Sequence, residues 1–319
     1  MAIIKPFKGI RPPKELVEEV ACLPYDVMNS DEAVEMAKGK DASLLHITRA
    51  EIEFEKGTDS HSALVYEKAK ENLDAFQKKG FLIQDTEAHY YIYAQTMNGN
   101  TQYGIVGAAS CQDYLDGKIK KHELTRPDKE EDRKVLTRYL KANIEPVFFT
   151  YRAVPEIDKI VTDIVTTNKA DYDFTAEDGF GHHFWVIEDA KINNSLEQLF
   201  KEKVPCTYVA DGHHRTAAAA GMSTEFAAKN PNHTGNEPYN FFMAVHFPDN
   251  QLKIIDYNRV VKDLNGLTSE EFTAKVGENF LINEISAAIV KPAKLHDFSM
   301  YVAGKWYGLT AKEGTYNDS

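Results

Sequence analysis

Apolar residues recur at helical spacing in several segments of the chain, most clearly in residues 61–79. The apolar positions that share one helical face there are Leu64, Ala69, Leu73 and Phe76. Gly80 follows directly, and a glycine in this place is typical of a helix end. The same pattern predicts further helices over residues 128–140, 155–167, 195–202, 214–229 and 269–276.

Runs rich in Tyr, Phe, Val, Ile and Thr predict strands between these helices. Residues 89–97 and 101–110 flank Asn98-Gly99, a dipeptide that favours the tight turn of a β-hairpin. The short apolar run at residues 44–47 predicts a buried strand. Further strands are expected over residues 146–151, 183–187, 206–210 and 241–247, and in a second hairpin around Gly304.

The order of these elements indicates the fold class. Helices and strands are interspersed, and the hairpins require antiparallel pairing. We therefore expect an α+β fold with mixed or antiparallel sheets and helices. The length of 319 residues allows two domains. We expect an N-terminal α+β domain over residues 1–112 and a second domain over residues 113–319.

The net charge of the chain argues against one class of partner. The formal charge is −12 at pH 7, and an acidic chain repels a phosphate backbone unless its basic residues cluster. The best basic run, Lys118–Lys121, is followed closely by acidic residues. We expect no nucleic-acid partner, although a pocket with a few donors can still hold a small anion.

Signals for export or membrane insertion are missing from the sequence. No run of 18 apolar residues exists, and the N-terminus lacks the apolar segment of a signal peptide. The cysteines, Cys22, Cys111 and Cys206, form neither a disulfide framework nor a CxxC metal motif. We therefore expect a cytoplasmic protein with reduced thiols and no membrane partner.

The segment Asp211-Gly212-His213-His214-Arg215 has the composition of an anion site. It follows an expected buried strand and begins an alanine-rich helix, whose first turn offers free N–H groups and partial positive charge. Gly212 lets the backbone approach a ligand. His213, His214 and Arg215 add donors, and arginine can grip a phosphate with two hydrogen bonds. A phosphate fits this combination best.

A metal ion is a second possibility at this turn. Asp211, His213, His214 and His182 are candidate ligands for a transition metal, but adjacent histidines do not share one helix face. Mg²⁺ held by Asp211 together with phosphate oxygens is the more natural arrangement, because Mg²⁺ prefers oxygen ligands and retains waters.

The segment His122-Glu123-Leu124-Thr125-Arg126 concentrates further polar side chains just before a helix that Pro127 starts. A carboxylate on such a loop can take a proton from a hydroxyl or from water. Glu123 is therefore a candidate catalytic group, with His122 and His214 as further catalytic candidates. Arg126 is a candidate ligand for an anion.

Four residues elsewhere are candidates for binding substrate. His46 lies in the strand expected at residues 44–47, Arg49 follows that strand, and both could reach the same pocket. Tyr25 lies in a turn that a proline starts, and His182 precedes an aromatic strand.

Seven segments spread over nearly the whole chain form a recognisable set: KPFKGIRPP, LPYDV, LLHITRAEI, IKKHELTRPDKEEDR, PVFFTY, VADGHHRTAAAA and FFMAVHFPDNQLKIIDYNRVVKDLNGL. In these segments the chain resembles a bacterial family known as DUF1015. Members of that family usually continue beyond the point where this chain ends, so a C-terminal truncation is expected. The turn VADGHHRTAAA also resembles the phosphate-binding turn of the ParB/sulfiredoxin superfamily, which in sulfiredoxin and the free serine kinases binds nucleotide phosphates.

These resemblances imply a ParB/sulfiredoxin-like core and phosphoryl transfer on a small hydroxy amino acid, with serine and phosphoserine as the expected pair. They imply ATP or ADP as co-substrate, Mg²⁺ as cofactor, Glu123 as general base and Arg126 as a clamp for phosphate or carboxylate. Transfer could run as a kinase or in reverse, to ADP or to water. Two alternatives stay open: a ParB-like nucleotide-binding regulatory module and a metal-dependent hydrolase. The absence of a GxxxxGK[ST] sequence excludes a P-loop kinase.

Overall fold

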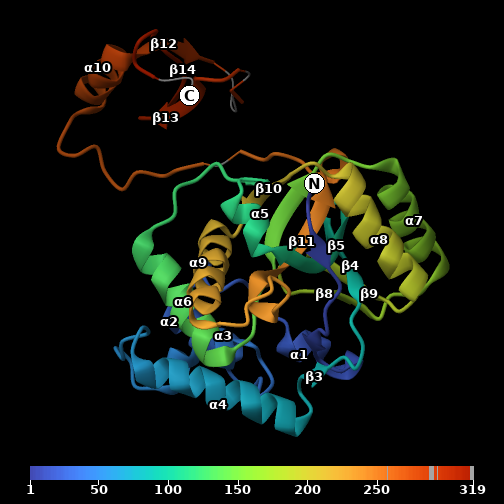
Figure 1. The fold of residues 1–319 in the computed structure, drawn as a ribbon. Coiled ribbons are helices and arrows are strands. Elements are labelled where there is room, and N and C mark those ends of the chain that lie inside the picture. The colour runs from blue at the N-terminus through green and yellow to red at the C-terminus, as the bar shows by residue number, and fades with distance from the viewer. Residues whose placement is uncertain (257, 287–290, 293, 317–319) are drawn as a thin grey trace. The chain divides into compact units, whose positions relative to one another are not determined.

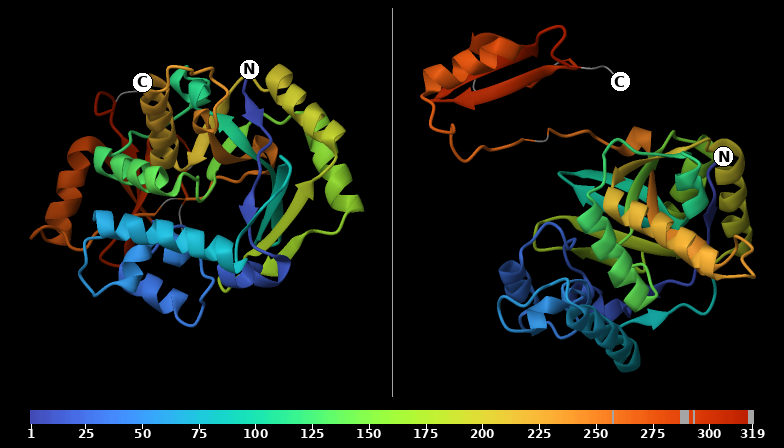
Figure 2. Two further views of the ribbon diagram at one scale, coloured as in Figure 1. Left: turned by 60° about the horizontal axis from the view of Figure 1, so that its bottom comes forward. Right: turned by 60° about the vertical axis from the view of Figure 1, so that its left-hand side comes forward.

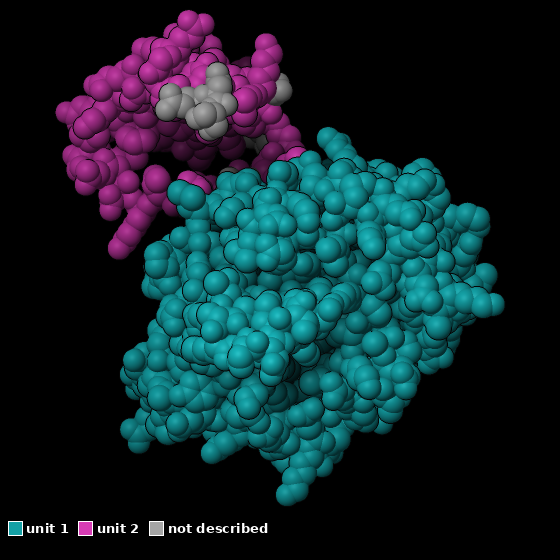
Figure 3. All heavy atoms as spheres, in the orientation of Figure 1, with its two compact units in different colours: residues 1–253 teal, residues 254–319 magenta. Residues whose placement is uncertain are grey.

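The chain divides into two compact units, residues 1–253 and residues 254–319 (Figure 3). The computed structural model describes residues 1–256, 258–286, 291–292 and 294–316. Each unit is built around its own sheet. The boundary expected at residue 112 lies within the first unit, where strands from both sides of that residue pair in one sheet.

A mixed sheet forms the centre of the first unit (Figure 1). Its strands are β1 (Ile4–Lys5), β4 (Tyr90–Met97), β5 (Asn100–Ser110), β6 (Ile119–Lys120), β7 (Val147–Tyr151), β8 (Tyr172–Thr175), β9 (Gly181–Ile187), β10 (Thr207–Asp211) and β11 (Phe241–Pro248). The order is β6-β10-β7-β11-β5-β4-β9-β8, and β1 pairs with β5. β6 lies parallel to β10 and β7 parallel to β11, whereas the other neighbours are antiparallel. The expected α+β fold with a mixed sheet is confirmed.

The hairpin of β4 and β5 forms as its turn residues predict. Asn98 and Gly99 both have positive φ, 51° and 77°, which is the backbone that a two-residue type I′ turn requires. β11 lies between β5 and β7, antiparallel to the first and parallel to the second. The central strand of the sheet is therefore the last of its strands in the sequence.

Helices α7 (Pro155–Thr167) and α8 (Ala190–Lys203) pack side by side on the sheet (Figures 1 and 2). A proline at the first position of α7 suits a helix start, because its missing N–H would have no helical partner. The two helices bury apolar side chains against the strands, among them Ile157, Leu196 and Phe200. This layer forms the largest core cluster of the described residues.

A second helical group covers β7 and β11 and extends away from the sheet. It contains α5 (Cys111–Leu115), α6 (Pro127–Leu140) and α9 (His213–Lys229). α9 packs against β7 and β11, and α6 packs against α9. The alanine-rich stretch of α9 permits this close approach, since Ala217, Ala218 and Ala220 are buried.

The N-terminal segments build a further layer around α6. They comprise β2 (Ile10–Arg11), α1 (Val17–Val20), α2 (Ser30–Ala37), α3 (Leu45–Thr48), α4 (Ala63–Lys79) and β3 (Ile83–Gln84). α4 ends at Gly80 with a φ of 77°, as its sequence predicts. The strand expected at residues 44–47 is wrong, because this run forms the one-turn helix α3, whose Leu45 and Ile47 are buried. A run so short fits either structure by its apolar pattern alone.

The second unit consists of α10 (Ser269–Asn279) and an antiparallel sheet in the order β12-β14-β13. Its strands are β12 (Phe280–Ile285), β13 (Asp297–Val302) and β14 (Lys305–Ala311). The hairpin expected around Gly304 is confirmed: Ala303 and Gly304 have positive φ between β13 and β14. Among the described residues of the whole chain, no helix has both the length and the apolar character needed to cross a membrane.

Candidate functional site

The turn between β10 and α9 is held in a backbone conformation that favours glycine. Gly212 has a φ of 89°, and α9 begins at His213 without a side-chain cap. A Cβ on Gly212 would lie 2.9 Å from Cγ1 of Val147 on β7. Glycine is therefore required both by the left-handed φ and by the close approach of the neighbouring strand. The first turn of α9 keeps its N–H groups available to an anion.

The segment that precedes α6 lies against this turn. Oε2 of Glu123 is 3.5 Å from Nδ1 of His213. The rings of His122 and His213 meet edge to face, with centroids 4.5 Å apart. The structure thus brings together two motifs that are far apart in the sequence, one with a carboxylate and one with a helix N-terminus.

Burial differs strongly between the two partners of this contact. The His213 side chain is 6% exposed, whereas that of Glu123 is 61% exposed and can reach a ligand. Burial, together with the neighbouring His122, lowers the pKa of His213 below its usual value, so its ring is neutral at pH 7. Nε2 of His213 and Nδ1 of His214 are buried and make no hydrogen bond within the described chain. Such atoms are candidates to bind a ligand or water.

Arg215 connects the turn to a more deeply buried carboxylate. Its Nη2 donates to Oδ2 of Asp211 at 2.8 Å, and its Nη1 donates to the carbonyl of Pro146 at 3.0 Å. Nη1 also lies 3.5 Å from Oε2 of Glu145. The guanidinium is therefore fixed from three sides at the start of α9.

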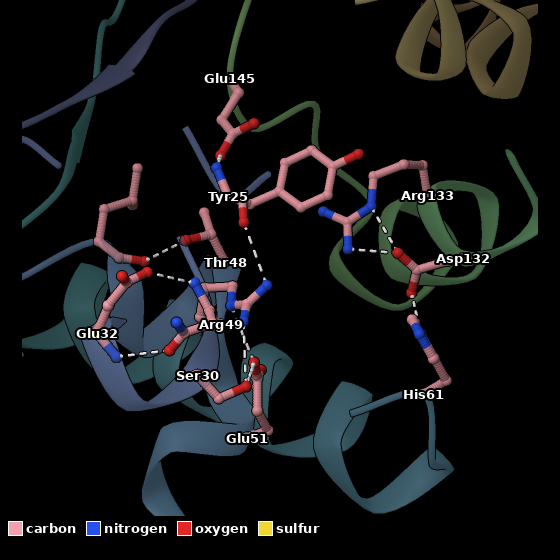
Figure 4. Close-up of polar contacts among 12 residues, drawn as sticks. Tyr25, Ser30, Glu32, Thr48, Arg49, Glu51, His61, Asp132, Arg133 and Glu145 are labelled. Carbon is pink, nitrogen blue, oxygen red and sulfur yellow. Dashed lines mark hydrogen bonds and ion pairs between the residues drawn. The ribbon is translucent and has the colours of Figure 1, made fainter. Parts of the chain in front are cut away.

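Tyr25 reaches this arrangement from the N-terminal layer. Its backbone N–H donates to Oε1 of Glu145 at 3.1 Å, as Figure 4 shows. The Arg133 guanidinium lies over its ring, 3.9 Å from the centroid. Arg49 donates to the carbonyl of Tyr25 at 3.1 Å and pairs with Glu51, so it holds the Tyr25 turn in place.

Three other predicted site residues, Arg126, His46 and His182, have their contacts away from the turn between β10 and α9. Arg126 is exposed and pairs with Asp128 at 2.6 Å. His46 uses both ring nitrogens inside the N-terminal layer, on Glu53 at 2.9 Å and on the Lys40 carbonyl at 3.2 Å.

His182 lies on β9, which four strands separate from β10 in the sheet order. Nδ1 of His182 is 2.7 Å from the hydroxyl oxygen of Tyr93, and its ring stacks on Phe174. The polar and aromatic contacts of His182 are thus made with β4 and β8, at the end of the strand order away from β10.

Two residues around Tyr25 and Arg215, namely Glu145 and Arg133, were not identified from the sequence. Neither Glu145 nor Arg133 was expected as a site residue. The one local signal is Glu145-Pro146 before a buried strand, where a charged residue enters the core.

A Mg²⁺ site at Asp211 fits the structure in a limited way. The Asp211 side chain is 66% exposed, and its Oδ2 already accepts from Arg215. No group of three or more His, Cys, Asp or Glu side chains in the described residues is arranged to hold a metal. Asp211 could thus be only one of several ligands, with phosphate oxygens and waters as the others.

The fold and the site define an α+β protein in which a carboxylate and histidines meet at a helix N-terminus. The family model for DUF1015, a protein of unknown function, matches residues 4–319. The chain therefore belongs to the DUF1015 family. No curated protein and no solved structure matches it.

Proposed function

We propose that this protein is a cytoplasmic enzyme that transfers a phosphoryl group to or from a small hydroxy amino acid, with serine and phosphoserine as the first candidate pair. The proposal rests on one observation above others. Glu123 lies 3.5 Å from His213 at the uncapped start of α9, so a proton acceptor stands beside a site suited to phosphate.

The phosphate would be held by groups of the turn itself. The N–H groups of His213, His214 and Arg215 point out of the first turn of α9, where the helix dipole favours negative charge. The buried Nε2 of His213 and Nδ1 of His214 are further candidates for contact. The resemblance of this turn to that of sulfiredoxin and the free serine kinases supports the same role.

The chemical step needs only one proton acceptor on the protein. In the kinase direction, Glu123 takes the proton of the serine hydroxyl, the hydroxyl oxygen attacks the terminal phosphorus of ATP, and ADP leaves. In the opposite direction, phosphoserine gives its phosphoryl group to ADP or to water. Mg²⁺, with Asp211 among its ligands, would neutralise phosphate charge. Most of the rate enhancement in such reactions comes from positioning and from charge stabilisation.

The first test measures both directions with the full chain. Phosphoserine is incubated with Mg²⁺, with and without ADP, and serine is incubated with ATP; serine, phosphate and nucleotides are quantified. We expect ADP-dependent loss of phosphoserine or ATP-dependent formation of it. Folding is checked in parallel by circular dichroism.

The other outcomes separate the rival functions. Phosphate release from phosphoserine that needs no nucleotide and stops with a chelator would indicate a metal-dependent hydrolase on the same site. Nucleotide binding without turnover would favour a regulatory module. A folded protein that is silent in every arm would remove serine and phosphoserine from the proposal.

A further inference from the structure

A small cavity of about 40 Å³ has Arg215 among its lining residues. Three charged side chains line it: Arg133 from α6, Arg215 from α9 and Glu145 from the loop before β7. Leu136, Leu140, Val147 and Phe242 supply apolar walls. A space of this size takes a few waters or the small polar end of a ligand.

Burial of its carboxylate and a left-handed backbone both make the position of Glu145 energetically unfavourable. Its side chain is 13% exposed, and its φ is 57°, a left-handed conformation unusual for a residue that precedes proline. Burial raises its pKa, although Arg215 and Arg133 oppose the shift. Strained backbone and buried carboxylates persist mainly where the surrounding structure enforces them, and they concentrate at functional sites.

The guanidinium of Arg133 has one donor group, Nη1, that is not used in its pairing with Asp132. Its Nε and Nη2 both donate to Oδ2 of Asp132, at 2.9 and 2.6 Å. Within the described residues its Nη1 makes no hydrogen bond, and its guanidinium plane lies on the Tyr25 ring (Figure 4). Asp132 is in turn anchored by His61 and by the Tyr66 hydroxyl, at 2.9 and 2.5 Å. The guanidinium is thus fixed in position with Nη1 available.

We propose that this cavity recognises the zwitterionic end of an α-amino acid, with Glu145 binding the ammonium group and Arg133 binding the carboxylate. One small space lined by a buried carboxylate and by an arginine with a free donor matches a ligand that carries both charges a few ångströms apart. This inference rests on the proposed function, because Arg215 joins the cavity to the turn that would hold the phosphate. The substrate class that fits both parts is an O-phosphorylated α-amino acid.

The test compares three ligands that differ by one charged group. O-phospho-L-serine has phosphate, ammonium and carboxylate; O-phosphoethanolamine lacks the carboxylate, and 3-phosphonooxypropionate lacks the ammonium. Dissociation constants are measured by calorimetry on the full chain, without nucleotide and with a chelator, so that turnover does not interfere. We expect O-phospho-L-serine to bind about 10- to 100-fold more tightly than either analogue, since each missing group removes one charged hydrogen-bonding contact.

Variants then assign each preference to one side chain. Glu145→Gln should weaken O-phospho-L-serine by about tenfold or more and leave 3-phosphonooxypropionate nearly unchanged. Arg133→Gln should remove the preference over O-phosphoethanolamine in the same way. The matched controls are Glu225→Gln and Arg138→Gln, since Glu225 on α9 and Arg138 on α6 pair at 3.0 Å and do not line the cavity. Both controls should bind all three ligands like the wild type.

Equal affinity of the wild type for all three ligands would overturn the inference, whether or not the variants fold. So would the absence of any binding of O-phospho-L-serine. If the charge preferences are present but no phosphoryl transfer occurs, the cavity inference stands and the proposed reaction fails. If phosphoserine is turned over while Glu145→Gln leaves the preferences intact, the reaction stands and the cavity inference fails.

Discussion

Nδ1 of His213 and Oε2 of Glu123 lie 3.5 Å apart, and this contact joins the loop before α6 to the first turn of α9. The histidine is buried and the carboxylate is largely exposed. Of the two side chains, the exposed carboxylate is therefore the one that a substrate can reach. The two side chains thus differ in solvent access, which their positions in the sequence do not reveal.

Glu123→Gln should lower kcat for phosphoryl transfer by about 10²- to 10⁴-fold, because the amide keeps the shape of the side chain but cannot accept the proton. KM should change little, since the amide still occupies the same place. Steady-state kinetics in whichever direction is active gives both constants. Glu131→Gln is the control, because Glu131 lies exposed on α6 and should leave kcat at the wild-type value. A Glu123→Gln enzyme that is folded and fully active would refute the assignment of the base.

Arg215→Met should destabilise the fold by about 3–5 kcal/mol, because it leaves the buried Glu145 carboxylate without its ion-pair partner. Adding Glu145→Gln to this variant should restore part of the loss, since the uncompensated charge is then gone. Urea unfolding of the wild type, both single variants and the double variant gives the coupling free energy.

The Arg138 and Glu225 pair provides the comparison for that cycle. It is more exposed, so its coupling should be only about 0.2–1 kcal/mol. A coupling between Arg215 and Glu145 that is no larger would mean that their contact contributes little to stability.

Gly212→Ala should lower stability by more than Gly235→Ala does. Both glycines have positive φ, 89° and 86°, where an alanine costs about 1–2 kcal/mol. A Cβ at Gly212 would also approach Cγ1 of Val147 to 2.9 Å, whereas at Gly235 nothing lies within 4 Å. Chemical denaturation of the two variants isolates the contact from the backbone effect. Equal losses would show that β7 yields to the added methyl group.

The stability of the first unit should depend on pH through His246. Its side chain is 1% exposed, between the rings of Phe149 and Phe200, and burial lowers its pKa from 6.5 to about 4. Between these values the unfolded chain binds a proton that the folded protein does not. The free energy of unfolding should therefore fall as the pH is lowered from about 6.5 to 4, by up to about 3 kcal/mol from this residue.

His246→Gln supplies the reference for that measurement, because glutamine does not titrate. The slope of unfolding free energy against pH between 6.5 and 4 should be smaller in the variant than in the wild type. Identical slopes would show that the imidazole gains its proton without unfolding the sheet.

Segments with a local start or stop signal could be predicted from the sequence. α7 was expected over residues 155–167 and has those bounds, because Pro155 starts it and its apolar face is regular. The two hairpins follow from turns in which both residues take positive φ. The run at residues 44–47 failed for a physical reason: four apolar residues fit a buried helical turn as well as a strand, and only packing against α4 decides.

The site could be predicted only in part, and for a related reason. The DGHHR turn and Glu123 belong to compact motifs, so their local sequence indicated them as candidates, and the resemblance implied the role of Glu123 as general base. Arg133 and Glu145 are ordinary charged residues in the sequence, and their role depends on burial and on which distant segments meet. His46 and His182 show the converse, since both were attractive in sequence and each has its contacts in another part of the fold.

The place of β11 has a consequence for the order in which the protein can be assembled on the ribosome. Without β11, the strands β6, β10 and β7 share no hydrogen-bonded ladder with β5, β4, β9 and β8. Residues 241–248 are synthesised after every other strand of that sheet. A nascent chain that stops short of them carries two half-sheets, each with an open inner edge. Such unpaired edges can pair with strands of other chains. The nascent protein therefore needs β11, which is synthesised last, to join the two half-sheets.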